Sequence, residues 1–188
     1  MAVAASAPHV DPSAAVWGAV RGGPPGPALS AADLRGLAAP LAGLVVVGCE
    51  LPPGALRGVR VPIGASDGDC LAAAIRELPP EADLLAWGGD VVPPDAWATA
   101  IAQLSAQLGD RDAAVFSVAV TDAVKHVRDG RIRGGVARDA ICRPVPPIVV
   151  RAAAARAALL ASLGHGRDPI PALCASGLRV RTVPVRTP

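Results

Sequence analysis

The chain has 188 residues, with 18 basic and 16 acidic side chains and a net charge of +2. This length suits one domain with a single core, and the near-neutral charge gives no general attraction for nucleic acid or an acidic membrane surface. With three Trp, one Phe and no Tyr, the chain also lacks the aromatic platform on which single-stranded nucleic acid stacks, so we expect no nucleic-acid partner.

The cysteine pattern and the apolar segments indicate a reduced, non-membrane environment. The four cysteines form no C-x-x-C pair and the three histidines lack metal-ligand spacing, which argues against zinc. The longest apolar run, "GLAAPLAGLVVVGC", contains a proline and is shorter than the ~20 residues of a spanning helix. No basic segment precedes an apolar stretch at the N-terminus, as it would in a signal peptide. We expect a cytoplasmic protein with no membrane association.

Strands and helices alternate along most of the chain. Residues 1–15 read as a loose leader and residues 16–188 as one domain. The predicted order is strand 14–20, helix 31–38, strand 43–48, strand 60–64, helix 66–78, strand 82–89, helix 93–109 and strand 113–120. A helix over 150–164 and a strand over 177–185 follow.

Local signals support these boundaries. Ser30 with Asp33 forms an N-cap signature, and Ser66 or Asp67 caps the next helix. The clearest helix has Trp97, Ile101, Leu104 and Leu108 on one face and ends at Gly109.

This alternation predicts an α/β fold with a three-layer, Rossmann-like and mostly parallel sheet. Ligands bind such sheets outside the carboxyl ends of the strands. Functional residues should therefore lie near four positions, Gly48, Gly64, Gly88 to Asp90, and Thr121.

The segment 121–140, "TDAVKHVRDGRIRGGVARDA", interrupts the alternation and contains the only lysine of the chain, Lys125. Asp129 and Gly130 suit a two-residue type I′ turn between "VKHVR" and "RIRGGV", which predicts a β-hairpin arm. Its residues are mostly polar or basic, so the arm is either a solvated flap or a surface that pairs with another chain.

Around the arm the chain has "AVTDAVKH", the Asp-Gly turn, "GVAR" and "ICRPVPP", in that order. This pattern resembles the 2-C-methyl-D-erythritol 4-phosphate cytidylyltransferases of the non-mevalonate isoprenoid pathway, which have a GT-A-like nucleotidyltransferase fold. That family reads roughly P-V-T-D-T-I-K-R, a turn, T-V-D-R and A-V-Q-T-P-Q before a helix. Upstream, "GASDGDCLAAAIRELPPEADLL" is similar to the family's G-G-x-x-R-x-x-S-V helix and the strand after it.

The resemblance implies a reaction between CTP and a sugar-alcohol phosphate, with release of pyrophosphate and with Mg²⁺ as cofactor. It implies that Arg138, which matches the arginine of T-V-D-R, binds the substrate phosphate and acts as the catalytic cation. Asp122 and Lys125 match substrate-side residues at the base of the arm. The family's substrate-binding threonine next to that aspartate is Ala123 here, and the threonine of T-P-Q is Pro146.

The nucleotide and metal elements match less closely. Arg21, Gly22 and Gly23 stand where the family has a glycine-rich triphosphate loop, but prolines follow and remove N–H donors, so an ordinary connecting loop is the alternative. Asp90 is the candidate Mg²⁺ ligand, with a helix-capping role as the alternative. The family's H-D-A-A-R-P arginine and its N-I-K-(I/V)-T lysine have no counterpart.

Two hypotheses follow from this pattern. The protein is either a divergent cytidylyltransferase, or a catalytically lapsed homologue kept as a binding, regulatory or heteromeric partner subunit. The resemblance also implies a homodimer in which the arm crosses to the second subunit, or a heterodimer with an intact paralogue.

Overall fold

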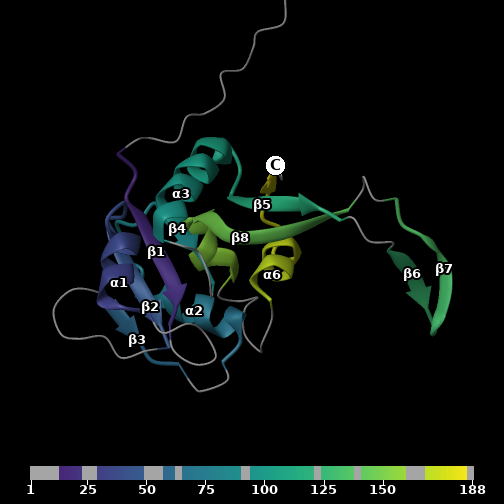
Figure 1. Ribbon diagram of the computed structural model, residues 1–188, viewed down its shortest axis with the longest axis horizontal. Helices are drawn as coiled ribbons and strands as arrows, with labels where there is room; N and C mark the ends of the chain where they lie inside the picture. Colours follow the sequence, from purple (N-terminus) through teal and green to yellow (C-terminus); the bar gives the residue numbers. More distant parts are fainter. Residues whose placement is uncertain are drawn as a thin grey trace, which may run out of the picture.

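A central sheet with helices on both faces forms the body of the protein (Figure 1). The computed structural model describes residues 13–22, 29–48, 57–61, 65–89, 94–120, 124–137, 141–159 and 168–185. Within these residues the sheet has seven strands, in the order β3-β2-β1-β4-β8-β5-β9. Their bounds are β1 Val16–Arg21, β2 Gly43–Val47, β3 Arg57–Val59, β4 Leu84–Trp87, β5 Ala113–Ala119, β8 Cys142–Arg151 and β9 Val180–Pro184.

Most strand pairs are parallel, as the sequence predicts. Strand β1 pairs in parallel with β2 and β4, β2 with β3, and β5 with β9. Strand β8 is the exception, because it pairs antiparallel with both β4 and β5. The three-layer, mostly parallel α/β fold is thereby confirmed.

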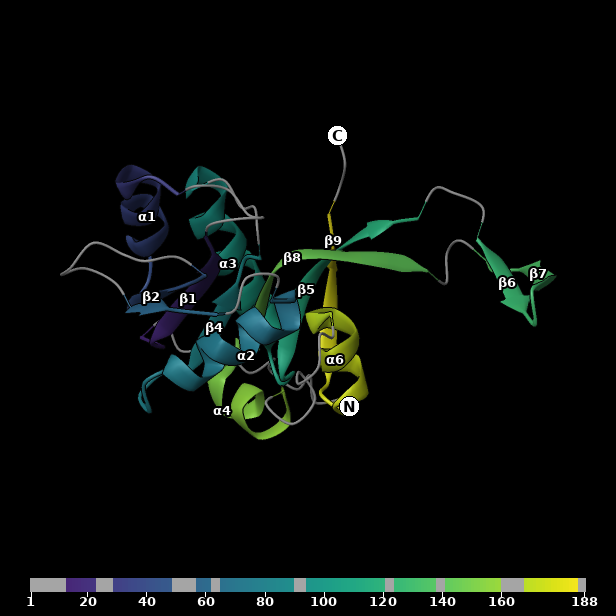
Figure 2. The same ribbon diagram turned by 90° about the horizontal axis from the view of Figure 1, so that it is seen from below.

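The helices cover the two faces separately (Figure 2). Helices α1 Ala31–Ala38 and α3 Pro94–Leu108 lie on one face, and α2 Asp67–Glu77, α4 Ala152–Ala154 and α6 Pro169–Ala175 lie on the other. Alternate residues of a strand pack into the two cores on opposite faces of the sheet. In β2, Leu44 and Val46 pack on the side of α1 and α3. Val45 and Val47 pack on the side of α2.

The predicted helix signals match the observed helix ends. Ser30 caps α1 and Ser66 caps α2, and each forms a capping box with the aspartate three residues later. The apolar face of α3 is buried as predicted, and Gly109 ends this helix with a φ of +54°.

The ring of Trp97 fits between the sheet and α3 because two neighbouring residues have no side chain. Trp97 is 0% exposed. A Cβ atom on Gly88 would lie 2.8 Å from Trp97 Cζ3, and one on Gly18 would lie 3.3 Å from Trp97 Cζ2. Gly18 within β1 and Gly88 directly after β4 therefore leave room for the indole beside these strands.

The structure corrects three sequence expectations. The strand expected at 60–64 is β3, Arg57–Val59, three residues earlier, and Arg60 and Val61 lie outside it. The segment 142–151, expected to lead directly into a helix at 150, is the long strand β8, whose apolar end, Ile148 to Val150, is buried between β4 and β5. The helix expected over 150–164 begins at Ala152 as the short α4 and continues as a π-helical turn, η2 Ala155–Leu159.

Helix α6 was not expected from the sequence. It begins with the proline pair of "PIPAL", and Asp168 caps it by accepting a hydrogen bond from the Ile170 N–H.

Several arginines hold the body together through backbone carbonyls. Arg151 donates from Nε to the Arg111 carbonyl at 3.0 Å and from Nη2 to the Gly109 carbonyl at 2.7 Å, which satisfies groups beyond the end of α3. Arg156 donates to the carbonyls of Leu78 and Pro79 after α2. Part of the arginine content therefore has a structural role.

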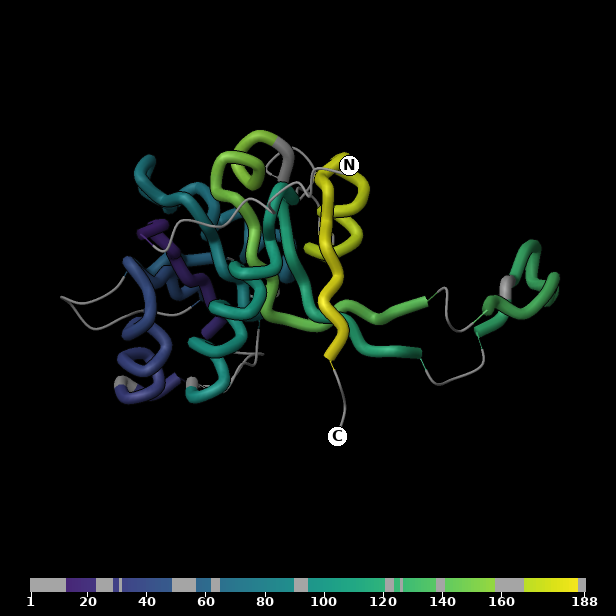
Figure 3. The backbone as a smooth tube through the Cα atoms, turned by 90° about the horizontal axis from the view of Figure 1, so that it is seen from above, coloured from purple at the N-terminus to yellow at the C-terminus, as the bar shows by residue number. Residues whose placement is uncertain are grey.

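The segment 121–140 forms the predicted arm. Strands β6 Lys125–Arg128 and β7 Arg131–Gly135 pair antiparallel, and Asp129 and Gly130 between them have φ values of +53° and +73°, as a type I′ turn requires. Strands β5 and β8 leave the body side by side toward the arm, which projects away from the sheet (Figure 3).

Candidate functional site

The carboxyl ends of β1 and β4 meet where the connections of the sheet change direction. From β1 the chain passes through α1 on one face to β2, and from β3 it passes through α2 on the opposite face to β4. Strand β1 lies between β2 and β4. In open α/β sheets ligands bind beside such a point, so this edge is the candidate site.

Arg21, the last residue of β1, extends from this edge toward the start of α2. Its Nη1 donates to Asp67 Oδ1 at 2.9 Å and its Nη2 to the Ala65 carbonyl at 2.9 Å. The side chain of Arg21 is 11% exposed and that of Asp67 is 44% exposed. The arginine predicted from the sequence to bind the triphosphate is thus at the expected edge, and a carboxylate of the same chain pairs with it.

Gly22 follows Arg21 and is buried at the same edge. Its N–H donates to the Val47 carbonyl at 2.9 Å, which extends the pairing of β1 with β2. Gly48 lies beside it with a φ of +92°, and a Cβ atom there would be 2.8 Å from the Gly22 carbonyl oxygen. The Gly22 N–H, which the sequence assigns to the triphosphate loop, is therefore already used in a hydrogen bond within the sheet.

A cavity of about 360 Å³ opens next to Asp67. Trp87 and Gly89 at the end of β4 form one wall, and Pro146 and Ile148 of β8 form another. The residues Asp168, Pro169 and Ile170 close it from the start of α6. Its lining combines apolar walls with two carboxylates, those of Asp67 and Asp168. Asp67 also accepts the hydrogen bond from Arg21, so it connects the cavity to the guanidinium.

Among the described residues, no group of three or more His, Cys, Asp or Glu side chains gathers in one place, and the carboxylate of Asp67 is engaged by Arg21. Asp90, the metal ligand expected from the sequence, lies outside the described residues.

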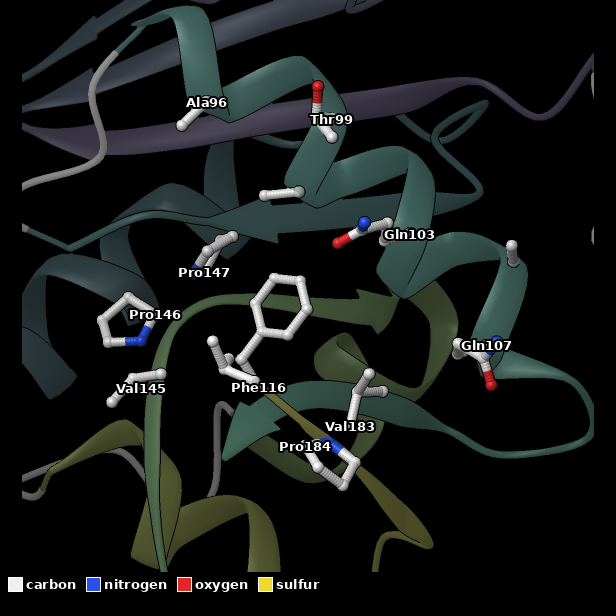
Figure 4. Close-up of a pocket in the computed structure, with 13 residues that line it drawn as sticks. Ala96, Thr99, Gln103, Gln107, Phe116, Val145, Pro146, Pro147, Val183 and Pro184 are labelled. Carbon is white, nitrogen blue, oxygen red and sulfur yellow. The ribbon is translucent and has the colours of Figure 1, made fainter. Parts of the chain in front are cut away.

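A larger groove of about 950 Å³ lies on the other face of the sheet, between α3 and the strands β5, β8 and β9 (Figure 4). Phe116 points into it from β5, and Pro147 and Val183 line it from β8 and β9. Among the described residues that line it, the polar ones are Thr99 and two glutamines of α3, and none is charged. This described lining offers no cation to a triphosphate.

The arm presents both basic and apolar side chains to solvent. Lys125 is exposed at its base, where it pairs with Gly135. Val127 and Ile132 are cross-strand partners and are 56% and 65% exposed. Arg128, Arg131 and Arg133 are exposed around them. The arm therefore has an uncovered apolar pair inside a basic surface.

The structure places three of the seven residues singled out from the sequence. Arg21 and Gly22 lie together at the sheet edge and Lys125 lies in the arm. Gly23, Asp90, Asp122 and Arg138 lie outside the described residues. Sequence reasoning considered Asp67 for a helix cap and did not expect it to contact Arg21, and it did not consider Asp168, because α6 was not expected.

Solved structures of cytidylyltransferases share this fold. The 4-diphosphocytidyl-2C-methyl-D-erythritol synthase of Anaerococcus prevotii matches with a TM-score of 0.68 and 14% identity, over 91% of this chain and 87% of the other. The 2-C-methyl-D-erythritol 4-phosphate cytidylyltransferase of Thermus thermophilus matches with a TM-score of 0.65 and 18% identity, over 90% and 88%. The Francisella tularensis enzyme has a TM-score of 0.64 and 14% identity, over 90% and 89%.

The chain has the fold of these cytidylyltransferases. The resemblance that the arm motifs predicted is thereby confirmed for the fold. No protein-family model matches the sequence, and no curated protein matches it. In the part of the chain that the structure describes, no helix is long and apolar enough to span a membrane.

Proposed function

We propose that the protein is a divergent cytidylyltransferase of the non-mevalonate isoprenoid type. An oxygen of the phosphate of 2-C-methyl-D-erythritol 4-phosphate attacks the α-phosphorus of CTP, the bond from that phosphorus to the bridging oxygen breaks, and pyrophosphate leaves. The observation that carries this proposal is the position of Arg21 at the carboxyl end of β1, beside a cavity at the end of β4, in a fold shared with such enzymes.

In this reaction the protein has to position two anions and stabilise the charge that develops on the pentavalent phosphorus. Arg21 would bind the triphosphate, with Gly22 and Gly23 as the turn beside it. Arg138, with Asp122 and Lys125 at the base of the arm, would bind the substrate phosphate. Asp90 would be the Mg²⁺ ligand.

A catalytically lapsed homologue is the second candidate, and two contacts favour it. The carboxylate of Asp67 engages Arg21, and the Gly22 N–H is already donated to Val47. The replacements Ala123 and Pro146 point the same way. Since one well-placed donor contributes about 100- to 1,000-fold to a rate, the loss of several would leave a binding, regulatory or partner subunit.

We also propose that the arm mediates assembly, as a homodimer or as a heterodimer with an intact paralogue. A lone two-stranded hairpin is marginally stable in water, and Val127 and Ile132 are exposed on this one. Contact with another chain would cover both side chains.

Calorimetric titration with CTP and Mg²⁺ tests the nucleotide proposal. We expect binding at micromolar to millimolar CTP that weakens in the Arg21→Gln variant and is unchanged in Arg128→Gln, an exposed arginine of the arm tip. No heat at millimolar CTP would refute nucleotide binding and leave the partner-subunit hypothesis.

A further inference from the structure

The ion pair between Arg21 and Asp67 joins the end of β1 to the first residue of α2. Two guanidinium nitrogens of Arg21 are engaged there, one by Asp67 Oδ1 and one by the Ala65 carbonyl, both at 2.9 Å. The arginine side chain is 11% exposed, whereas that of Asp67 is 44% exposed and lines the cavity. The pair therefore has a fixed, largely covered cation and a carboxylate with room to move.

A carboxylate offers a guanidinium the same kind of anionic oxygen that a phosphate offers. Asp67 is also the first residue of an 11-residue helix, α2, whose amino end carries partial positive charge. Its carboxylate thus lies between a cation and the positive end of a helix, a position that equally suits a phosphate oxygen.

We propose that Asp67 is an internal competitor for the anion site of Arg21. Its carboxylate holds the guanidinium when no ligand is bound, and a diphosphate or triphosphate group has to displace it toward the cavity. Asp67 therefore lowers the affinity of Arg21 for phosphates. The inference rests on the proposed function in taking a polyphosphate as the ligand.

The competition has a consequence for stability. When the Asp67 carboxylate is removed, the largely covered guanidinium of Arg21 loses an anionic partner, which destabilises the folded state. A bound polyphosphate supplies the missing charge and stabilises the variant by mass action. Loss of Asp67 should consequently lower the melting temperature without ligand and increase the rise that ligand produces.

The test uses inorganic pyrophosphate as the probe, at constant ionic strength, with calorimetric titration and thermal melting of the full chain. The central variant is Asp67→Asn. Asp168→Asn is the matched control, because Asp168 lines the same cavity, carries the same charge and caps α6. The double variant Arg21→Gln/Asp67→Asn shows whether any gain requires the arginine.

We expect Asp67→Asn to bind pyrophosphate about fivefold more tightly than the unmodified protein, the factor expected when an ion pair of ordinary strength no longer competes. Asp168→Asn should change the affinity less than about twofold, and the double variant should lose the gain. If Asp67→Asn does not fold, Asp67→Ser takes its place, since serine is compatible with a helix start.

Equal pyrophosphate affinity in the unmodified protein and Asp67→Asn would overturn the proposal, as would an equal gain in Asp168→Asn. These results are independent of cytidylyl transfer. A protein that releases pyrophosphate from CTP but shows no effect of Asp67→Asn has the proposed function without the competition. A protein with the fivefold effect but without turnover has the competition without that function.

Discussion

The contact between Gly88 and Trp97 permits a quantitative test of the packing beside the candidate site. In Gly88→Ala, the new Cβ would lie 2.8 Å from Trp97 Cζ3 and 3.1 Å from Trp97 Cη2, closer than carbon atoms pack. Trp97 is 0% exposed, so either the strand end or the indole has to shift. Overpacking of this kind costs about 1–3 kcal/mol, and we expect Gly88→Ala to lower the free energy of unfolding by about 2 kcal/mol.

A double-mutant cycle isolates the cause. Trp97→Leu alone should cost about 2–3 kcal/mol, because it removes part of a buried aromatic ring. In that background Gly88→Ala should cost less than about 0.5 kcal/mol, since the clashing atoms are absent. Urea denaturation followed by circular dichroism measures all four proteins.

Gly134→Ala is the control, because no atom of the described part of the chain lies within 4 Å of a Cβ built on this glycine of β7. It should be neutral or stabilising by less than about 1 kcal/mol. An equal cost of Gly88→Ala in the Trp97 and Leu backgrounds would refute the packing account.

Three further predictions concern a partly buried contact, pH and assembly. Arg151→Met removes both hydrogen bonds from this side chain to the Gly109 and Arg111 carbonyls and should lower the free energy of unfolding by about 2 kcal/mol in urea; a cost below about 0.5 kcal/mol would contradict the role of this contact. The Arg179 backbone N–H, above all, holds the pKa of Asp112 below its ordinary value of 3.8. The stabilisation by the Asp112 carboxylate should therefore be complete above about pH 3.8 and be lost as the pH falls below that value. Urea denaturation from about pH 6 to about pH 3 should show the free energy of unfolding of the protein approaching that of Asp112→Asn. A difference that stays constant over this range would refute the prediction. Deletion of residues 124–136 should convert a dimer into a monomer in light scattering at micromolar concentration, and a protein that is monomeric with and without these residues would exclude the arm as an interface.

Much of the fold was predictable because its signals are local. Ser30 and Ser66 each bring a capping aspartate three residues later, and the buried face of α3 repeats at helical spacing. The Asp-Gly turn fixed the position of the arm, since few other residues adopt two successive positive φ values.

Strand β8 was missed for a different reason. Three prolines lie within or next to its exposed half, at 144, 146 and 147, and prolines argue against a strand in sequence reasoning. The strand exists because its other half, Ile148 to Val150, is buried between two partners. Long-range pairing overrode the local signal here.

The candidate site was predictable only in part. The position of Arg21 at a strand end follows from the alternation of elements, but its partner Asp67 is 46 residues away. Nothing in the spacing of the two residues indicates an ion pair. Such a contact depends on how α2 packs against the sheet, and this packing is a property of the tertiary structure.

The most direct test of the proposed function is pyrophosphate release from CTP in the presence of 2-C-methyl-D-erythritol 4-phosphate and Mg²⁺. The cytidylyltransferase proposal predicts release that requires both substrates, falls at least about 100-fold in Arg138→Ala and persists in Arg131→Ala, a control on the exposed arm. Absence of release at millimolar substrates, with the protein folded and able to bind CTP, would contradict catalysis and support the partner-subunit hypothesis.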